Sequence, residues 1–420
     1  MTEKKIKILT LSDHPLTPSG VGTQTRYIIE GMLKTGKYQF ISLAGLIKHQ
    51  DYRPIKTEEF GDDWILIPTD GYGTQESIRA LLWSEKPDMI WFMTDPRFWG
   101  WLWQIEEEVR YNVPMVYYHV WDNYPYPTFN KPYYLSNDYI ATISKVTDDI
   151  VANVAPEVAH DYIPHAVNLD VFKPLEEELV SKMRSDNFKE NKDKFIIFWN
   201  NRNARRKMGA TLILWFKEFL DKVGHDKAVL LMHTNPHDQA GSNLEALIAD
   251  LGINDGQVLF SKEKLDPANL AMMYNMVDCT INISDAEGFG LGTLESLSCG
   301  TPIIVNMTGG LQEQVTDGKE WFGIGLEPTS KTIVGSQDVP FIYEDRLAKE
   351  QVVEALLEMF NKTPEERKQL GLKGRQHVET NYNFENFIKT WDEVLTKVHE
   401  KHGSWETRNR KQNWTLKEVA

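Results

Sequence analysis

The chain has 420 residues, of which 41% are hydrophobic and 25% are charged. This length and balance are typical of a soluble globular protein with two or three domains, and they exclude a disordered, collagenous or coiled-coil chain. The formal net charge of −15 disfavours a polyanionic partner unless basic side chains gather locally.

Short apolar runs of β-forming residues alternate with helical patterns along the chain. In the first part, strands are predicted over residues 6–11, 40–46, 64–67, 89–93 and 116–119, with helices over residues 24–34 and 76–84. The alternation resumes with predicted strands over residues 195–199, 228–233, 258–260, 279–283 and 302–305. Such alternation is typical of parallel sheets with helices on both faces. We therefore predict an α/β protein with two doubly wound sheets, separated by the polar residues 176–194.

The cysteines and the apolar runs indicate a cytoplasmic protein. Cys279 and Cys299 are the two cysteines, too few for a disulfide framework, and they suit a reducing compartment. No apolar run reaches the roughly 18 residues that a membrane-spanning helix needs. The N-terminal residues run into a strand pattern and lack the apolar core of a signal peptide.

The most informative segment covers residues 284–295, which follow a predicted strand and open a predicted helix. Its backbone amides are open to close approach by a ligand because of three glycines, Gly288, Gly290 and Gly292. The start of the helix favours a phosphate at the same place, whereas the carboxylates of Glu287 and Glu295 suit sugar hydroxyls. Together these features point to a nucleotide sugar. The alternative is a glycine-rich turn with two solvated glutamates.

Two further segments that follow predicted strands carry related chemistry. Residues 308–313 form a second glycine-containing loop with a carboxylate. Residues 200–209 carry four cations, Arg202, Arg205, Arg206 and Lys207. Arginine offers a planar fork and lysine a point charge to phosphate oxygens. A charge run is usually a solvated face, but directly after a strand it is well placed for a diphosphate.

These motifs resemble those of the retaining, family 4 (group 1) glycosyltransferases of GT-B fold. Glu287 and Glu295 match the E-x7-E signature of that family, Arg202 and Lys207 match its R-x4-K pair, and residues 309–313 match its GG-x-x-E turn. Weaker matches, in chain order, are residues 18–22, 118–119, 143–144, 163–172 and 271–278. The resemblance spans roughly residues 5–400.

The resemblance implies two doubly wound Rossmann-like domains that face a central cleft, with a C-terminal helix that crosses back to the first domain. Residues 1–170 would form an acceptor-binding domain and residues 171–385 a nucleotide-sugar-binding domain. Residues 386–400 would be the cross-over helix and residues 401–420 a polar tail. Residues 330–345 depart from the family pattern as an insertion.

The resemblance also implies roles for the matching residues. Arg202 and Lys207 would neutralise the leaving nucleotide diphosphate, whose charge grows in the transition state. Glu287 would position the donor sugar together with the amides of Phe289, Gly290 and Leu291. Glu295 would hold the ribose hydroxyls. The other donor-binding candidates are Gly20 and Gly22 of the first loop, and Gly309, Gly310 and Glu313.

His119 would contact the donor sugar or the reacting oxygen. A histidine at the end of an apolar strand is more often a buried core residue, so the motif alone supports this role. No metal or other cofactor is expected, because no closely spaced Asp-x-Asp follows a strand and the cations of residues 202–207 can supply the charge. UDP is the commonest donor nucleotide of the family, so a UDP-sugar is the expected donor.

An aromatic loop over residues 121–134 follows His119 and provides the acceptor candidates, which are Trp121, Tyr124, Tyr126 and Phe129. Aromatic faces stack on sugars or on bases, and the alternative is a packed loop. No basic amphipathic helix of the kind that serves lipid acceptors is present in this half. A membrane-bound acceptor is therefore disfavoured.

Three functions are compatible with these observations. The first is transfer of a hexosyl or pentosyl group to a hydroxyl of a soluble acceptor, most simply a carbohydrate. The second is a phage-type glycosyltransferase acting on hydroxymethylated DNA bases, which the aromatic loop and a basic tail would fit, with Lys401, Trp405, Arg408, Arg410, Lys411 and Trp414. The third is a non-catalytic sugar-nucleotide binding module. The net charge argues against the second, and the complete set of motif residues argues against the third.

Overall fold

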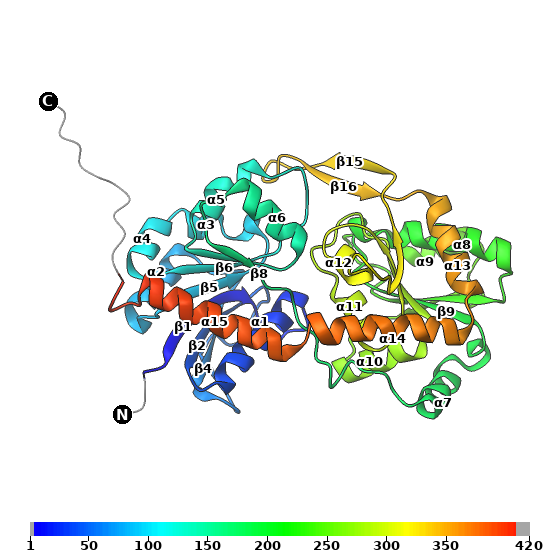
Figure 1. The fold of residues 1–420 in the computed structure, drawn as a ribbon, viewed down its shortest axis with the longest axis horizontal. Helices are drawn as coiled ribbons and strands as arrows, with labels where there is room; N and C mark the ends of the chain where they lie inside the picture. Colours follow the sequence, from blue (N-terminus) through cyan, green and yellow to red (C-terminus); the bar gives the residue numbers. More distant parts are fainter. Residues whose placement is uncertain (1–3, 409–420) are drawn as a thin grey trace. The chain divides into compact units, whose positions relative to one another are not determined.

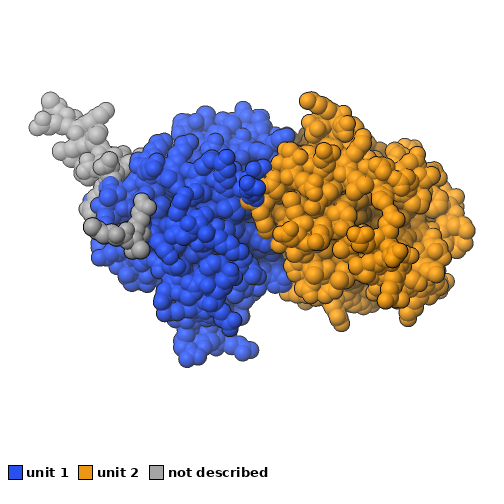
Figure 2. All heavy atoms as spheres, turned by 60° about the horizontal axis from the view of Figure 1, so that its bottom comes forward, with its two compact units in different colours: residues 1–165, 337–340, 385–420 blue, residues 166–336, 341–384 orange. Residues whose placement is uncertain are grey.

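The computed structural model describes residues 4–408. The chain divides into two compact units, coloured separately in Figure 2. Unit 1 comprises Met1–His165, Gln337–Pro340 and Glu385–Ala420, and unit 2 comprises Ala166–Ser336 and Phe341–Phe384.

Unit 1 contains, within the described residues, an eight-stranded sheet in the order β3-β4-β2-β1-β5-β6-β7-β8. Neighbouring strands are parallel except β3 and β4, which pair antiparallel at one edge. The strands are β1 (Ile6–Asp13), β2 (Tyr38–Gly45), β3 (Ile55–Thr57), β4 (Gly61–Pro68), β5 (Met89–Met93), β6 (Met115–His119), β7 (Tyr139–Thr142) and β8 (His160–Tyr162). The helices are α1 (Gly20–Lys34), α2 (Gln75–Glu85), α3 (Gly100–Trp103), α4 (Glu106–Asn112), α5 (Lys131–Leu135), α6 (Lys145–Val154) and α15 (Phe384–His402).

The C-terminal helix α15 packs on unit 1, as Figure 1 shows in red. Its buried face includes Trp391 and Leu395, four residues apart and therefore one turn apart on the same side of the helix. The hydroxyl of Tyr38 at the start of β2 donates to Asp392 over 2.7 Å. The predicted return of this helix to the first domain is confirmed.

The segment after α15 is partly buried in unit 1. The side chain of Arg408 lies 3.0 Å from the carboxylate of Asp138 and also donates to the backbone carbonyl of Arg110. Trp405 packs edge-on against Trp83, with ring centroids 5.3 Å apart. The interpretation of Arg408 as a cation for DNA is therefore wrong, because its charge is used inside the protein. Arg410, Lys411 and Trp414 lie outside the described residues.

Unit 2 contains a six-stranded parallel sheet in the order β11-β10-β9-β12-β13-β14, within the described part of the chain. Its strands are β9 (Phe195–Asn200), β10 (Ala228–His233), β11 (Val258–Ser261), β12 (Cys279–Asn282), β13 (Ile303–Asn306) and β14 (Gly323–Leu326). The helices are α7 (Glu177–Phe188), α8 (Gly209–Val223), α9 (Leu244–Asp250), α10 (Pro267–Met276), α11 (Leu291–Ser298), α12 (Leu311–Val315), α13 (Lys349–Asn361) and α14 (Pro364–Asn381). The prediction of an α/β protein with doubly wound sheets is confirmed.

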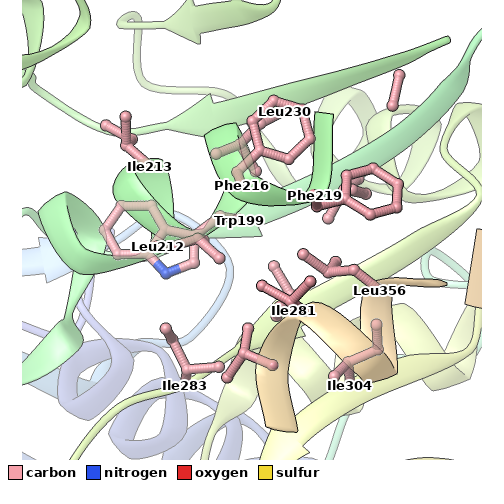
Figure 3. Packing of buried hydrophobic residues seen from close by; sticks show 14 of the residues in the cluster. Trp199, Leu212, Ile213, Phe216, Phe219, Leu230, Ile281, Ile283, Ile304 and Leu356 are labelled. Carbon is pink, nitrogen blue, oxygen red and sulfur yellow. The ribbon is translucent and has the colours of Figure 1, made fainter. Parts of the chain in front are cut away.

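The hydrophobic core of unit 2 lies between its sheet and helices α8 and α13. Figure 3 shows Trp199 of β9 among Leu212 and Phe216 of α8, with Leu356 of α13 nearby. Helix α8 buries residues spaced three and four apart, which is the pattern of an amphipathic helix on a sheet. Strands β9 and β10 are buried along almost their whole length, so they are continuous apolar runs rather than alternating ones.

The strand order of unit 2 identifies the sheet edge at which a ligand is expected to bind. From the central strand β9 the chain proceeds to β10 and β11 on one side, and then returns to β12 on the other side. The loops that follow β9 and β12 therefore diverge at the same sheet edge. In open α/β sheets this switch point at the carboxyl ends of the strands is where ligands bind.

Candidate functional site

Three loops meet at the carboxyl edge of the unit 2 sheet. They follow β9, β12 and β13, and they cover residues 201–208, 283–290 and 307–310. The amide of Asp285 donates to the carbonyl of Arg206 over 2.9 Å, which joins the first loop to the second. The amide of Gly310 donates to the carbonyl of Glu287 over 3.1 Å, which joins the second to the third. The three motif segments singled out in the sequence therefore form one site.

Gly310 allows the second and third loops to approach closely. A Cβ atom at this position would lie 2.7 Å from Cα of Phe289 and 2.8 Å from the carbonyl oxygen of Gly288. These are backbone atoms, so they can move only if the whole loop moves. The residue has φ −70°, an angle that any amino acid adopts, and the requirement for glycine is therefore purely steric.

Gly310→Ala is expected to destabilise the protein by about 1–3 kcal/mol, because the added methyl overpacks the contact between the two loops. It should also weaken nucleotide binding, since the loop that carries Glu287 must shift. Urea denaturation and isothermal titration with UDP measure the two effects. Gly100→Ala is the control, because no atom lies within 4 Å of a Cβ there. Unchanged stability and UDP affinity in Gly310→Ala would contradict the steric argument.

Lys207 and Glu287 form an ion pair at the centre of the site. The ammonium of Lys207 contacts Oε2 of Glu287, and the two side chains are only 11% and 12% exposed. The amide of Asn282, the last residue of β12, lies 3.3 Å from the same carboxylate oxygen. Burial by itself would raise the pKa of Glu287, but the charges of Lys207 and Arg206 outweigh burial and lower the pKa. Glu287 is therefore an ionised acceptor at neutral pH.

The other three cations of the basic segment have separate partners. Arg202 lies 2.7 Å from Asp238 and its side chain is 69% exposed. Arg205 makes a two-pronged contact with Glu344, and Arg206 donates to the carbonyl of Ala286. The segment is thus not a uniform basic surface, because each cation has its own acceptor in the structure.

Glu295 lies at one end of a short chain of polar side chains. Its Oε2 accepts a hydrogen bond of 2.9 Å from the hydroxyl of Tyr274, which in turn accepts one of 2.7 Å from the amide of Asn200. Burial raises the pKa of Glu295 to about 7. The sequence analysis missed Asn200, although a polar residue that ends the apolar strand β9 was an available signal.

For the remaining donor-binding candidates of unit 2, the structure shows mainly backbone contacts and backbone angles. Phe289 is buried, and its carbonyl accepts from Gln314 over 2.7 Å. Gly290 and Gly309 have φ of 91° and 48°, and Leu291 begins helix α11. Glu313 is 7% exposed, and its carbonyl accepts from the hydroxyl of Tyr382 over 3.1 Å. Their roles in donor binding stay predictions.

The two glycines of the first loop in unit 1 differ in their exposure and contacts. Gly20 is exposed at the start of α1, whereas Gly22 is buried. The amide of Gly22 donates to the hydroxyl of Ser19 over 2.9 Å, and a Cβ at Gly22 would lie 2.8 Å from the carbonyl oxygen of His14. The hydroxyl of Ser19, the N-cap residue of α1, thus accepts from the amide of Gly22, and the expected role of Gly22 at the diphosphate stays a prediction.

His119 has no exposed surface. Its Nε2 lies 2.8 Å from the hydroxyl of Tyr134, and burial lowers the pKa of the imidazole to about 3, so the ring is neutral. The expected contact of His119 with the donor sugar stays a prediction. The alternative of a core histidine at a strand end describes its position.

The aromatic loop after His119 is partly a packed loop. Trp121 is 5% exposed, its indole nitrogen donates to the carbonyl of Asn123 over 2.8 Å, and its ring meets that of Phe129 at 5.9 Å. Trp121 is therefore a packing residue and does not offer a face for an acceptor. Tyr124 and Tyr126 both donate to Asp149, over 2.7 and 3.0 Å, and Tyr126 is 41% exposed. Of the four acceptor candidates, Tyr126 is the most accessible.

The described residues contain neither a candidate membrane span nor a candidate metal cluster. No helix among residues 4–408 is both long enough and apolar enough to cross a membrane. No group of three or more histidine, cysteine, aspartate or glutamate side chains in that part of the chain has the arrangement of a metal site. That no metal is required stays a prediction.

Comparison with solved structures defines the fold class. Sucrose-phosphate synthase from Thermosynechococcus elongatus superposes with a TM-score of 0.74 at 18% identity, covering 95% of this chain and 100% of that one. Anabaena Alr3699/HepE, solved in complex with UDP and glucose, superposes with a TM-score of 0.69 at 14% identity, covering 93% and 100%. The chain has the GT-B fold.

Comparison of sequences relates part of the chain to a known family. Residues 181–377 match the model of the glycosyl transferases group 1. The D-inositol 3-phosphate glycosyltransferase of Acidothermus cellulolyticus is 43% identical over 76 residues, 18% of this chain and 16% of that protein. That of Corynebacterium jeikeium is 27% identical over 183 residues, 43% of each. Over residues 181–377, the chain is similar to the group 1 glycosyltransferases. The matched segments span less than half of these curated relatives.

Proposed function

We propose that the protein is a retaining glycosyltransferase that moves a hexosyl or pentosyl group from a UDP-sugar to a hydroxyl of a soluble carbohydrate. The observation that carries the proposal is the buried Lys207–Glu287 pair on glycine-bearing loops at the switch point of unit 2. This arrangement combines a cation for phosphate with a carboxylate for sugar hydroxyls. Unit 1 would then supply the acceptor site.

The names of the related proteins support this donor and acceptor class. Solved neighbours include Anabaena Alr3699/HepE in complex with UDP-glucose and a trehalose-6-phosphate protein of E. coli bound with UDP-2-fluoro glucose. The curated relatives are D-inositol 3-phosphate glycosyltransferases. UDP-sugar donors and polyhydroxylated acceptors are thus the chemistry to test first.

In the proposed reaction, the bond between the anomeric carbon and the β-phosphate oxygen breaks, and a bond to the acceptor oxygen forms on the same face of the sugar. The proton of the acceptor hydroxyl passes to the leaving diphosphate. Negative charge gathers on the leaving diphosphate. Lys207 and Arg202 stabilise that charge, so no metal ion is required. The ionised carboxylate of Glu287 accepts from donor-sugar hydroxyls, and Glu295 accepts from the ribose. We place the reaction in the cytoplasm, because Cys279 and Cys299 are free and buried.

The alternative of a DNA glycosyltransferase has lost part of its support. Arg408, one of the cations assembled for it, is buried against Asp138, and Trp121 offers no stacking face. The net charge of −15 also opposes a nucleic-acid partner. No structural observation favours this function over a carbohydrate transferase.

The proposal is tested by incubating the protein with UDP-, GDP- and ADP-sugars and a panel of mono- and disaccharides and inositol. Mass spectrometry is expected to show a sugar-sized gain on an acceptor with a UDP-sugar, without added metal and in the presence of EDTA. NMR of the product should show that the anomeric configuration of the donor is retained. Glu287→Gln is the inactive control.

Each part of the proposal has its own contradicting result. No nucleotide released from any donor would leave only a binding module. A gain confined to an added arm of hydroxymethylcytosine-containing duplex DNA would establish the DNA alternative. Loss of turnover in EDTA that Mg²⁺ restores would contradict metal independence.

A further inference from the structure

Residues 330–346 contain an antiparallel hairpin whose two strands, labelled β15 and β16 in Figure 1, belong to unit 2. Strand β15 (Ser330–Val334) is largely exposed, whereas Glu344 in the middle of β16 (Ile342–Arg346) is 2% exposed. A two-stranded hairpin alone is at best marginally stable in water. The stability of the hairpin therefore depends on the contacts that β16 makes with the rest of unit 2.

Asp345 joins β16 to two of the three loops of the candidate site. Its amide donates to the carbonyl of Asp285 over 2.8 Å, in the loop after β12. Its carbonyl accepts from the side-chain amide of Asn306 over 3.0 Å, and its carboxylate accepts from the hydroxyl of Thr308 over 2.8 Å. Strand β16 thus bridges the loops that carry Glu287 and Gly310.

Four charged side chains continue this connection to the basic segment. Arg205 donates to both carboxylate oxygens of Glu344, with one contact of 2.8 Å. Arg346 lies 2.9 Å from Glu344 on one side and 2.7 Å from Asp285 on the other. Basic and acidic side chains therefore alternate from Arg205, through β16, to Asp285, two residues before Glu287, and burial raises the pKa of Asp285 to about 7.

The chemistry of this row is suited to fixing geometry. A buried ion pair is often no more stabilising than apolar residues of the same volume, because both charges lose their hydration. Hydrogen bonds are directional, however, and the two-pronged contact of Arg205 with Glu344 fixes the relative orientation of these two side chains. It also commits Arg205 to Glu344.

We propose that Arg346 is a positioning residue of the donor site: through Asp285 it fixes the loop that carries Glu287. The proposal rests on the proposed function, since it concerns the same loop. Arg346 acts on Asp285 and not on the substrate. The insertion in the family pattern is in this view an intramolecular support for the donor loop.

The test measures loop mobility and catalysis separately in Arg346→Met and Arg346→Lys. In Arg346→Met, the amides of residues 285–290 are expected to exchange hydrogen about 10-fold faster than in the wild type. The value of kcat should fall by roughly 10–100-fold, because a small displacement of a reacting group has such an effect. KM for the donor should change less. Arg346→Lys keeps the charge and should recover part of both losses.

Two further variants separate positioning from loss of stability. Arg346→Met combined with Asp285→Asn removes the carboxyl left without its cation, so it should regain thermal stability and remain slow. Ile333→Thr, at a side chain with 70% exposure on β15, should leave exchange and kcat unchanged. Wild-type kcat in the double variant, or wild-type exchange in Arg346→Met, would overturn the proposal. Faster exchange in a protein that never transfers sugar would sustain the support of the loop and overturn the proposed function instead.

Discussion

Lys207→Met is expected to lower kcat for sugar transfer by roughly 10²–10³-fold, the usual effect of removing one group that stabilises charge in a transition state. Methionine keeps the length and the apolar stem of the side chain but removes its positive charge. The charge of the diphosphate grows as the donor bond breaks, so the transition state loses more than the bound donor does. Initial rates at varied donor concentration should therefore show a larger fall in kcat than rise in KM.

A second variant distinguishes catalysis from stability. Lys207→Met leaves Glu287 as a buried carboxylate without its cation, a change that costs about 3–5 kcal/mol of folding free energy in comparable pairs. Lys207→Met combined with Glu287→Gln removes both charges and should recover stability but not kcat. Lys217→Met is the control, because its ion pair with Asp221 lies on the outer face of α8. Wild-type kcat in Lys207→Met would contradict the role of the ammonium.

Asp138→Ala is expected to lower the free energy of unfolding by about 3–5 kcal/mol. The carboxylate of Asp138 is 1% exposed and lies within 3.3 Å of the guanidinium groups of Arg110 and Arg408, which are 6% and 3% exposed. Its removal takes the shared carboxylate from two buried cations, which keep Glu106 and backbone carbonyls as acceptors. Urea denaturation followed by tryptophan fluorescence measures the effect. Glu406→Ala is the control, since its contact with Lys4 is 69% exposed at both side chains and should contribute less than about 1 kcal/mol.

The carboxyl group of Asp138 is also expected to make the free energy of unfolding depend on pH. Burial by itself would raise the pKa of Asp138, but the charges of Arg110 and Arg408 outweigh burial and lower it. Because the folded pKa lies below the unfolded value of about 3.9, this contribution is present above that pH and is lost as the pH falls through the folded pKa. Asp138→Asn should reduce the loss of stability in acid. A variant as sensitive to acid as the wild type would contradict this assignment.

The sequence predicted the longer elements well and the short ones poorly. Residues 89–93 and 228–233 form β5 and β10 as predicted, because strands buried on both faces are uninterrupted apolar runs. Strands β3 and β8 have three residues each, too few to show a period. The polar segment 176–194 was taken as a separator, but most of it is helix α7, whose pattern is weakly amphipathic.

The residues of the candidate site also differ in how well the sequence predicted them. Glu287, Lys207 and Gly310 could be found because glycine spacing and charge directly after a strand are local signals. The burial of His119 and Trp121 could not be predicted, since an aromatic residue near a strand end has the same local pattern whether it faces solvent or the core. The structure shows that both are buried.

The sequence by itself determined the fold class, the order of the strands along the chain, and the three motif loops that build the site. The tertiary structure decided the partner of each charge: Glu344 binds Arg205 from 139 residues away, and Arg408 reaches Arg110 across 298 residues. The physical reason is that the energy of a charge depends on its distance to other charges and on its burial. Both are properties of the folded chain, and no spacing along the sequence encodes them.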